Sequence, residues 1–147
     1  MKEGQAGKDH HSAVNRRGDH EMGFSHLKTA HHFRLYEDGG AIEVEALDAA
    51  DTASRDQIRE HLSYIAKMFA DGDFAKPKAV HDQTVPGTLA MARLKTDISY
   101  KFENAERGGR VRISTTNSEA LAAIHEFLRF QIQDHRTGDA LEVSKKQ

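Results

Sequence analysis

The sequence predicts an α+β fold in which one four-stranded antiparallel sheet carries two main helices on one face. Apolar and polar residues alternate in two hairpins, each with a Gly-Gly pair at its turn, and an amphipathic helix follows each hairpin. The two helices match when Ile58 is aligned with Ile124, which also aligns Leu62 with Leu128. We interpret this as a duplicated β-β-α unit, because two such units most simply build one antiparallel sheet covered by both helices.

The first unit spans residues 29–72. Its hairpin turns at Gly39-Gly40, with one set of alternating side chains on each side of the strands. Ser54 and Gln57 have the spacing of a capping box, and Asp51 is a helix-starting residue that coincides with Asn117 in the match of the helices. Gly72 is predicted to end the helix. The helix face predicted to point inward contains Ile58, His61, Leu62, Ile65 and Phe69.

The second unit spans residues 97–138 and repeats the plan. Its hairpin turns at Gly108-Gly109, and Asn117 or Ser118 caps the helix that ends at Gly138. The inward face contains Leu121, Ile124, Leu128 and Ile132. Residues 73–96 form a linker with a short helical pattern through Leu89, Met91 and Leu94.

Length and composition predict a single domain over residues 24–140 of the 147-residue chain. Residues 1–23 are predicted to be a disordered, histidine-rich tail and residues 141–147 a second tail, because both lack periodicity and are polar. The chain has no cysteine, which excludes disulfides, iron–sulfur clusters and thiol nucleophiles. No apolar run is long enough to span a membrane, and a net charge of −2 gives no general attraction to nucleic acid.

Ten histidines stand in this chain, and six of them fall between Met1 and His32. Imidazole is the commonest metal ligand in proteins and titrates near neutral pH. Many histidines without thiols suit copper, nickel and some zinc sites. The alternative interpretation is a polar tail with scattered surface histidines.

The candidate metal ligands are His31, His32, His61 and His81. His31 shares a strand face with Phe33, and His61 lies on the inward helix face where the second unit has Phe127. A single half-buried histidine is more often a hydrogen-bonded core residue, but two that converge favour a binding role. His81 lies in the linker next to Asp82 and could instead be a solvent-exposed loop residue.

His32 points to the opposite sheet face from His31, so it joins the same site only if the strand begins there. Met22 is a possible further ligand, and the role of His26 stays open. We expect His125 at the rim of its helix, as a structural residue, and His135 in the last helical turn, where the helix dipole favours a cation. His10, His11 and His20 belong to the predicted tail.

No strong catalytic motif is present: the sequence contains no HExxH, phosphate-binding glycine loop or nucleophile elbow. Arg107, Arg110, Arg112 and Lys101 form a small basic area on the second hairpin. The outward positions there include no aromatic residue that could stack on bases, so we predict no nucleic-acid partner. A homodimer through that face is a further possibility.

The segments HHFRLYEDGGAIEV and IHEFLRFQI, with the helix REHLSYIAKMF between them, resemble a small, uncharacterised bacterial family. The resemblance covers nearly all of the predicted domain. Members of that family typically carry an export signal, so the resemblance implies a periplasmic protein, and it implies no established activity. It favours His31, His32, His61, His81 and His125 as family features. This chain itself opens without a signal peptide, so a cytoplasmic location also stays open.

The leading hypothesis is an extracytoplasmic metal-binding protein, copper first, that stores, delivers or senses the ion through clustered histidines. Zinc is the alternative ion. A haem protein or an enzyme with a catalytic metal is the second hypothesis, although little supports catalysis. The third is a non-enzymatic module that binds a protein partner or a second copy of itself.

Overall fold

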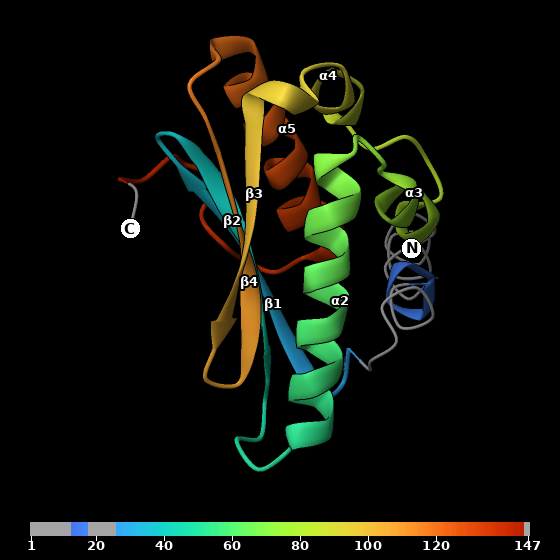
Figure 1. The fold of residues 1–147 in the computed structure, drawn as a ribbon. Coiled ribbons are helices and arrows are strands. Elements are labelled where there is room, and N and C mark those ends of the chain that lie inside the picture. The colour runs from blue at the N-terminus through green and yellow to red at the C-terminus, as the bar shows by residue number, and fades with distance from the viewer. Residues whose placement is uncertain (1–12, 18–25, 146–147) are drawn as a thin grey trace.

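The computed structural model describes residues 13–17 and 26–145 of the chain. Its centre is the predicted four-stranded antiparallel sheet, and the strand order is β1-β2-β4-β3. The strands are β1 (Thr29–Tyr36), β2 (Gly39–Ala46), β3 (Ile98–Ala105) and β4 (Gly108–Thr115). Helices α2 (Thr52–Ala70) and α5 (Ser118–His135) pack on one face of this sheet (Figure 1). The predicted fold class is therefore confirmed.

The two hairpins share a common register. β1 corresponds to β3, and β2 to β4, when each strand is aligned from its first residue. In the central pair β2–β4, Gly40 lies opposite Ile113 and Val44 lies opposite Gly109. Gly40 corresponds to Gly109, and Val44 corresponds to Ile113. The pair Gly40–Ile113 in one half is therefore equivalent to the pair Gly109–Val44 in the other. An origin of this correspondence in a duplication stays a prediction.

Each main helix begins at a side-chain cap. Asp51 caps α2 by accepting a hydrogen bond from Ser54 N at 3.0 Å, and Asn117 caps α5 by accepting one from Ala120 N at 3.0 Å. The predicted start of the helix at Asp51 is thus confirmed, whereas the capping box that begins at Ser54 is not used. Asp51 reaches the free amides first, and Ser54 lies inside the first turn, where its hydroxyl donates to Asp51 at 2.7 Å.

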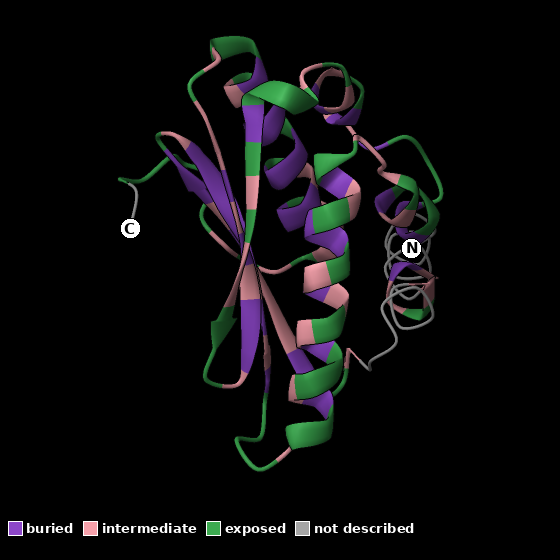
Figure 2. Ribbon diagram, viewed as in Figure 1, coloured by how far each residue is buried: buried purple, intermediate pink, exposed green. Residues whose placement is uncertain are grey.

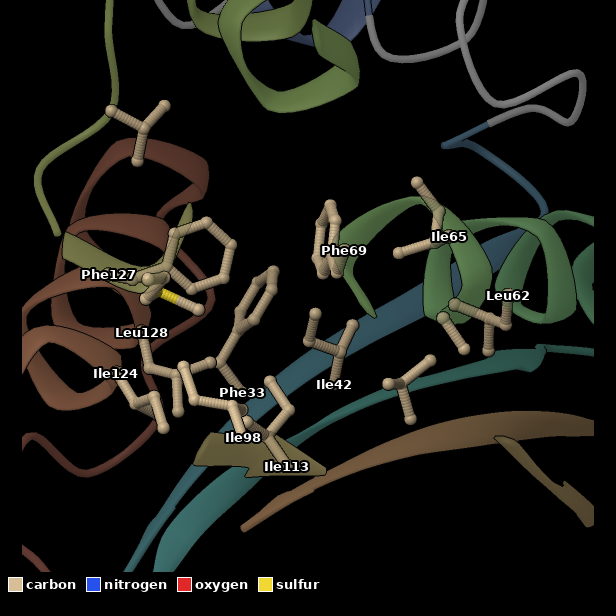
Figure 3. Packing of buried hydrophobic residues seen from close by; sticks show 14 of the residues in the cluster. Phe33, Ile42, Leu62, Ile65, Phe69, Ile98, Ile113, Ile124, Phe127 and Leu128 are labelled. Atoms are coloured by element: carbon tan, nitrogen blue, oxygen red, sulfur yellow. The ribbon is translucent and has the colours of Figure 1, made fainter. Parts of the chain in front are cut away.

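The core lies between the sheet and the two helices (Figures 2 and 3). α2 lies over β3 and β4, whereas α5 lies over β1 and β2, so each helix covers the hairpin of the other half. The side chains predicted to face inward do so: Ile58, Leu62, Ile124 and Leu128 are all buried. Phe69 and Phe127 meet edge to face at 5.9 Å in the middle of this layer.

The linker forms helices α3 (Ala75–His81) and α4 (Thr88–Arg93) and the 3-10 turn η1 (Lys95–Asp97). α4 covers the helical pattern predicted through Leu89 and Met91. Met91 is fully buried, whereas Leu89 is exposed.

Two parts of the predicted tails are ordered against the domain. Residues 13–17 are helical, Val14 is fully buried, and Arg17 Nε donates to Val80 O at 2.7 Å. At the other end Ser144 forms a parallel bridge with Tyr36 at the open edge of β1. Neither contact could be predicted from the polar composition of these segments. One depends on a single apolar residue, Val14, and the other on backbone hydrogen bonds of Ser144. The rest of the predicted tails, residues 1–12, 18–23 and 146–147, lies outside the described residues.

Candidate functional site

A cavity of about 70 Å³ lies between the sheet, α2, α3 and α5. It is larger than the space needed for one water molecule and smaller than a pocket for a drug-sized ligand. Its wall is mostly apolar, with Phe33, Phe69 and Phe127 among its members. The polar side chains in the wall are His31, His61, Lys76, His81, Gln131 and His135. The cavity therefore unites three of the four predicted ligands, His31, His61 and His81.

His31 and His61 approach the cavity from the sheet and from α2 respectively. Burial, together with the nearby charges of Lys76 and His31, lowers the pKa of His61 to about 4. His61 is therefore a neutral imidazole at neutral pH. A neutral ring keeps a lone pair on one nitrogen, which is the form that binds a metal ion or accepts a hydrogen bond.

His135 ends α5 and was missed by the sequence prediction as a site residue. Its ring stacks on His31 at 6.1 Å with an angle of 7° between the planes, and on Phe33 at 5.8 Å. The helix dipole alone would explain a histidine at this position, which is why no further role was predicted. The match of the two helices places His135 at the position of Phe69, and that signal could have identified it as an inward residue.

His81 is only 2% exposed, so the predicted alternative of a solvent-exposed loop residue is wrong. It closes α3, and its Nδ1 pairs with Asp134 while its Nε2 lies 2.9 Å from Gln131 Oε1. Its ring also meets His135 edge to face at 4.7 Å. Both nitrogens of His81 are thus engaged by α5, which fixes the ring and attaches α3 to the body.

Three of the four histidines that line the cavity have aromatic counterparts in the other half of the molecule. Aligning the strands and the helices from their first residues matches His31 with Tyr100, His61 with Phe127 and His135 with Phe69. These counterparts also contact one another, because Phe69 lies 5.9 Å from Tyr100 and 5.9 Å from Phe127. Phe69 and Phe127 line the same cavity as the three histidines that correspond to this aromatic group.

The hydrogen-bond partners of His81 on α5 are polar, whereas their counterparts on α2 are apolar. Gln131 corresponds to Ile65 and Asp134 to Met68 in the match of the helices. Tyr100, the counterpart of His31, carries a buried hydroxyl without a hydrogen-bond partner among the described residues, and burial raises its pKa. The imidazoles near His81 are thus accompanied by a carboxamide and a carboxylate, whereas the counterparts of these residues are aromatic or aliphatic.

His32, the fourth predicted ligand, lies apart from this cavity. Its Nδ1 is 2.9 Å from Asp139 Oδ1, and it lines a separate hollow on the outer sheet face with Arg34, Glu43 and Arg110. Asp139 also accepts a hydrogen bond from Phe33 N at 3.0 Å. His32 therefore lies on the opposite sheet face from His31, as the alternation of the strand predicts. There it connects the C-terminal segment to β1.

His125 is buried, so the expected position at the helix rim is wrong. Its Nε2 lies 2.8 Å from Tyr36 O and 3.0 Å from Gly39 O, at the turn of the first hairpin. This contact is structural, as predicted for the residue's role. His26 does not line the cavity, and Met22, His10, His11 and His20 lie outside the described residues.

The outward arginines of the second hairpin are paired with acids. Arg110 Nε donates to Glu103, and Arg112 donates to Asp38 at 2.7 Å. Across residues 13–17 and 26–145, no helix is both long and apolar enough to cross a membrane. The same residues contain no group of three or more His, Asp or Glu side chains already arranged around a metal position.

Comparisons with protein families, with curated proteins and with solved structures found no match to this chain. Chemically, the cavity offers imidazole nitrogens, of which that of His61 is neutral, in a mostly apolar wall that also includes Lys76. The side chains that line it include no serine, threonine or carboxylate that could act as a nucleophile.

Proposed function

We propose that this protein binds a copper ion in the cavity through His31, His61 and His135, and that it stores, delivers or senses the ion. The observation that carries the proposal is that these three histidines line one cavity at positions that correspond to Tyr100, Phe127 and Phe69. A single histidine at a core position can be tolerated at some cost in packing. Three neighbouring histidines at positions that correspond to aromatic residues favour a metal-binding function. His135 thus takes the place beside His31 and His61 that the sequence prediction gave to His81.

The donor set suits copper. Imidazoles without thiolates are ligands that copper accepts readily, and a mostly apolar wall favours the singly charged Cu(I), which needs only two or three nitrogen donors. His61 has no proton to lose at neutral pH, because its pKa lies at about 4. Metal binding would therefore release few protons there. The rings must turn inward on binding, since the described histidines are not yet grouped around a common point.

His81 supports the site from behind. Asp134 and Gln131 hold its ring, and its edge contacts His135 at 4.7 Å. Carboxylates and carbonyls that orient a histidine are a usual second layer around metal sites. His81 becomes a ligand itself only if it gives up one of these two bonds, so we rank it behind the other three. We place His32 outside the site.

A haem is disfavoured by size, because the cavity of about 70 Å³ is far smaller than a porphyrin. Zinc remains the competing ion, since it accepts the same nitrogen donors. A periplasmic location would fit a thiol-free copper site, because thiols oxidise there, and rests on the family resemblance. Immunoblotting of periplasmic and cytoplasmic fractions with the native gene would test it.

The test replaces each histidine by the residue that the other half carries: His31→Tyr, His61→Phe and His135→Phe. Protein purified without a polyhistidine tag is titrated with Cu(I) against a chromogenic chelator, and separately with Cu(II) and Zn(II). We expect one Cu(I) per chain and a loss of affinity of about 10-fold or more in each variant, comparable to the loss of one ligand or its support.

The matched control is His125→Arg, which copies Arg59 at a buried histidine outside the cavity. It should leave the copper affinity unchanged. Unchanged affinity in all three cavity variants, or tighter binding of zinc than of copper, would overturn the proposal as stated.

A further inference from the structure

The two edges of the sheet, β1 and β3, differ in whether another segment of the described chain forms hydrogen bonds with them. Along β1 the C-terminal segment satisfies the edge: Asp139 accepts from Phe33 N, Ser144 N donates to Leu35 O at 2.9 Å, and Glu37 N donates to Ser144 O at 3.1 Å. Within residues 13–17 and 26–145, β3 has a single partner strand, β4. Figure 1 shows β3 unobstructed along its length.

The outer edge of β3 lacks the usual devices that prevent pairing with another chain. Edges are commonly blunted by proline, by bulges or by several lysines. β3 contains no proline, and it pairs with β4 residue by residue from Ile98 to Ala105 without a bulge. Lys101 is its only lysine, and Glu103 follows two positions later on the same face.

The order Lys101-Phe102-Glu103 is complementary to itself. If two copies of β3 pair antiparallel around Phe102, each Lys101 lies directly opposite Glu103 of the other copy. Opposite charges at directly opposed positions stabilise such a pair. Glu103 already accepts from Arg110 in its own chain, and a carboxylate has acceptor sites left for a second donor.

The helix above this edge leaves room for a second copy. α2 lies over β3 and β4, so two copies of α2 would be about two strand spacings, roughly 10 Å, apart, which is close to the distance between packed helices. By helical periodicity, the side of α2 opposite His61 carries the small residues Ser63 and Ala70, together with Arg55 and Arg59. Arg59 is held against its own sheet by bonds to Ala105 O and Gly108 O, so Ser63 and Ala70 are the positions where a second helix can approach.

We propose that two copies of this chain dimerise through β3, antiparallel around Phe102, and so form one continuous eight-stranded sheet. The two cavities would lie on the outer sides of this dimer, because His61 faces away from the shared edge. The proposal does not depend on copper binding.

The test is sedimentation equilibrium of the full chain between about 1 and 100 μM. Lys101→Glu and Glu103→Lys should each weaken the dimer by about 10-fold, because each turns two attractive pairs into repulsive ones. The double variant K101E/E103K restores both attractions and should return the dimer. Lys145→Glu makes the same charge change near the covered β1 edge and serves as the control.

Circular dichroism of each variant separates a lost interface from a lost fold. A monomer at the highest concentration would overturn the proposal. A dimer that ignores both single substitutions would also overturn it, because the contact would then lie elsewhere, and so would a failure of the folded double variant to recover.

Discussion

His125 and Arg59, one on each main helix, hold the turns of opposite hairpins at corresponding carbonyl groups. His125 Nε2 contacts Tyr36 O and Gly39 O, while the Arg59 guanidinium donates to Ala105 O at 2.7 Å and to Gly108 O at 2.9 Å. These carbonyls lie at matching positions of the two hairpins, on the last residue of one strand and the first residue of the next. The carbonyls of one hairpin turn are thus bonded by a buried imidazole, and those of the other by a partly exposed guanidinium.

His125→Ala should lower the free energy of unfolding by about 2 to 3 kcal/mol, because it leaves two carbonyl oxygens without their donor in a buried place. His125→Arg should recover part of this loss, since Arg59 shows that a guanidinium can reach both carbonyls of such a turn. Urea unfolding measures both variants. Equal losses in the two variants would show that packing around the imidazole matters and its hydrogen bonds do not.

His61 should make the stability of the protein depend on pH. Its pKa is about 4 in the folded state and near 6.5 in the unfolded state, so the unfolded state binds the proton more readily between these values. The stabilisation is complete above pH 6.5 and is lost as the pH falls, by roughly 3 kcal/mol at pH 4. Chemical unfolding across this range measures it.

His61→Phe should remove this part of the pH dependence. At neutral pH and without metal, the variant should be as stable as the original or more stable by about 1 kcal/mol, because Phe buries more apolar surface. Parallel stability curves for the two proteins between pH 4 and 6.5 would contradict the assignment of the slope to His61.

Asp139→Ala should release the C-terminal segment from β1. The substitution removes the acceptor for Phe33 N and the partner of His32 together. We expect faster hydrogen exchange at the amides of Phe33 and Glu37 and a cost of about 1 to 2 kcal/mol. Exchange at Phe102 in β3 is the internal control. Unchanged protection at Phe33 and Glu37 would mean that the segment is held mainly by Ser144.

Alanine at Gly39 or Gly108 should be strongly destabilising in both halves. A Cβ at Gly39 would lie 2.1 Å from Ile113 O, and one at Gly108 would lie 2.1 Å from Val44 O. Neither oxygen can retreat without opening the β2–β4 pair, so each variant should lose more than about 3 kcal/mol. Gly138→Ala, with a positive φ of 78° but no neighbour within 4 Å, should cost only about 1 kcal/mol. Thermal unfolding ranks the three, and a small loss at Gly108 would contradict the close approach.

The fold could be predicted because its information is local. The alternation in 29–46 and 98–115 and the apolar stripes of the two helices require only neighbouring residues to be compared. The crossing of the helices over opposite hairpins could not be predicted this way, because either pairing of helix and hairpin would bury the same stripes. Asp51 could be identified as a helix-starting residue from its match with Asn117, whereas Ser54 offered a competing capping pattern of its own.

Part of the candidate site could also be predicted. His31 and His61 were identified from strand alternation and from the match with Phe127. His135 was missed because its position at a helix end already had a sufficient explanation. The burial of His81 could not be predicted, because it depends on Asp134 and Gln131, which lie far away in the sequence on another helix.

The wide sequence separation within the site also fixes the order in which it is made. His31 and His32 leave the ribosome long before their contacts His135 and Asp139 are synthesised. During translation β1 can pair with β2. Its contacts with His135 on the cavity side and with Asp139 and Ser144 at its edge can form only after these residues have been made. The nascent chain therefore exposes His31 and His32 to solvent before their contacts exist, and the cavity is enclosed only after α5 has been made.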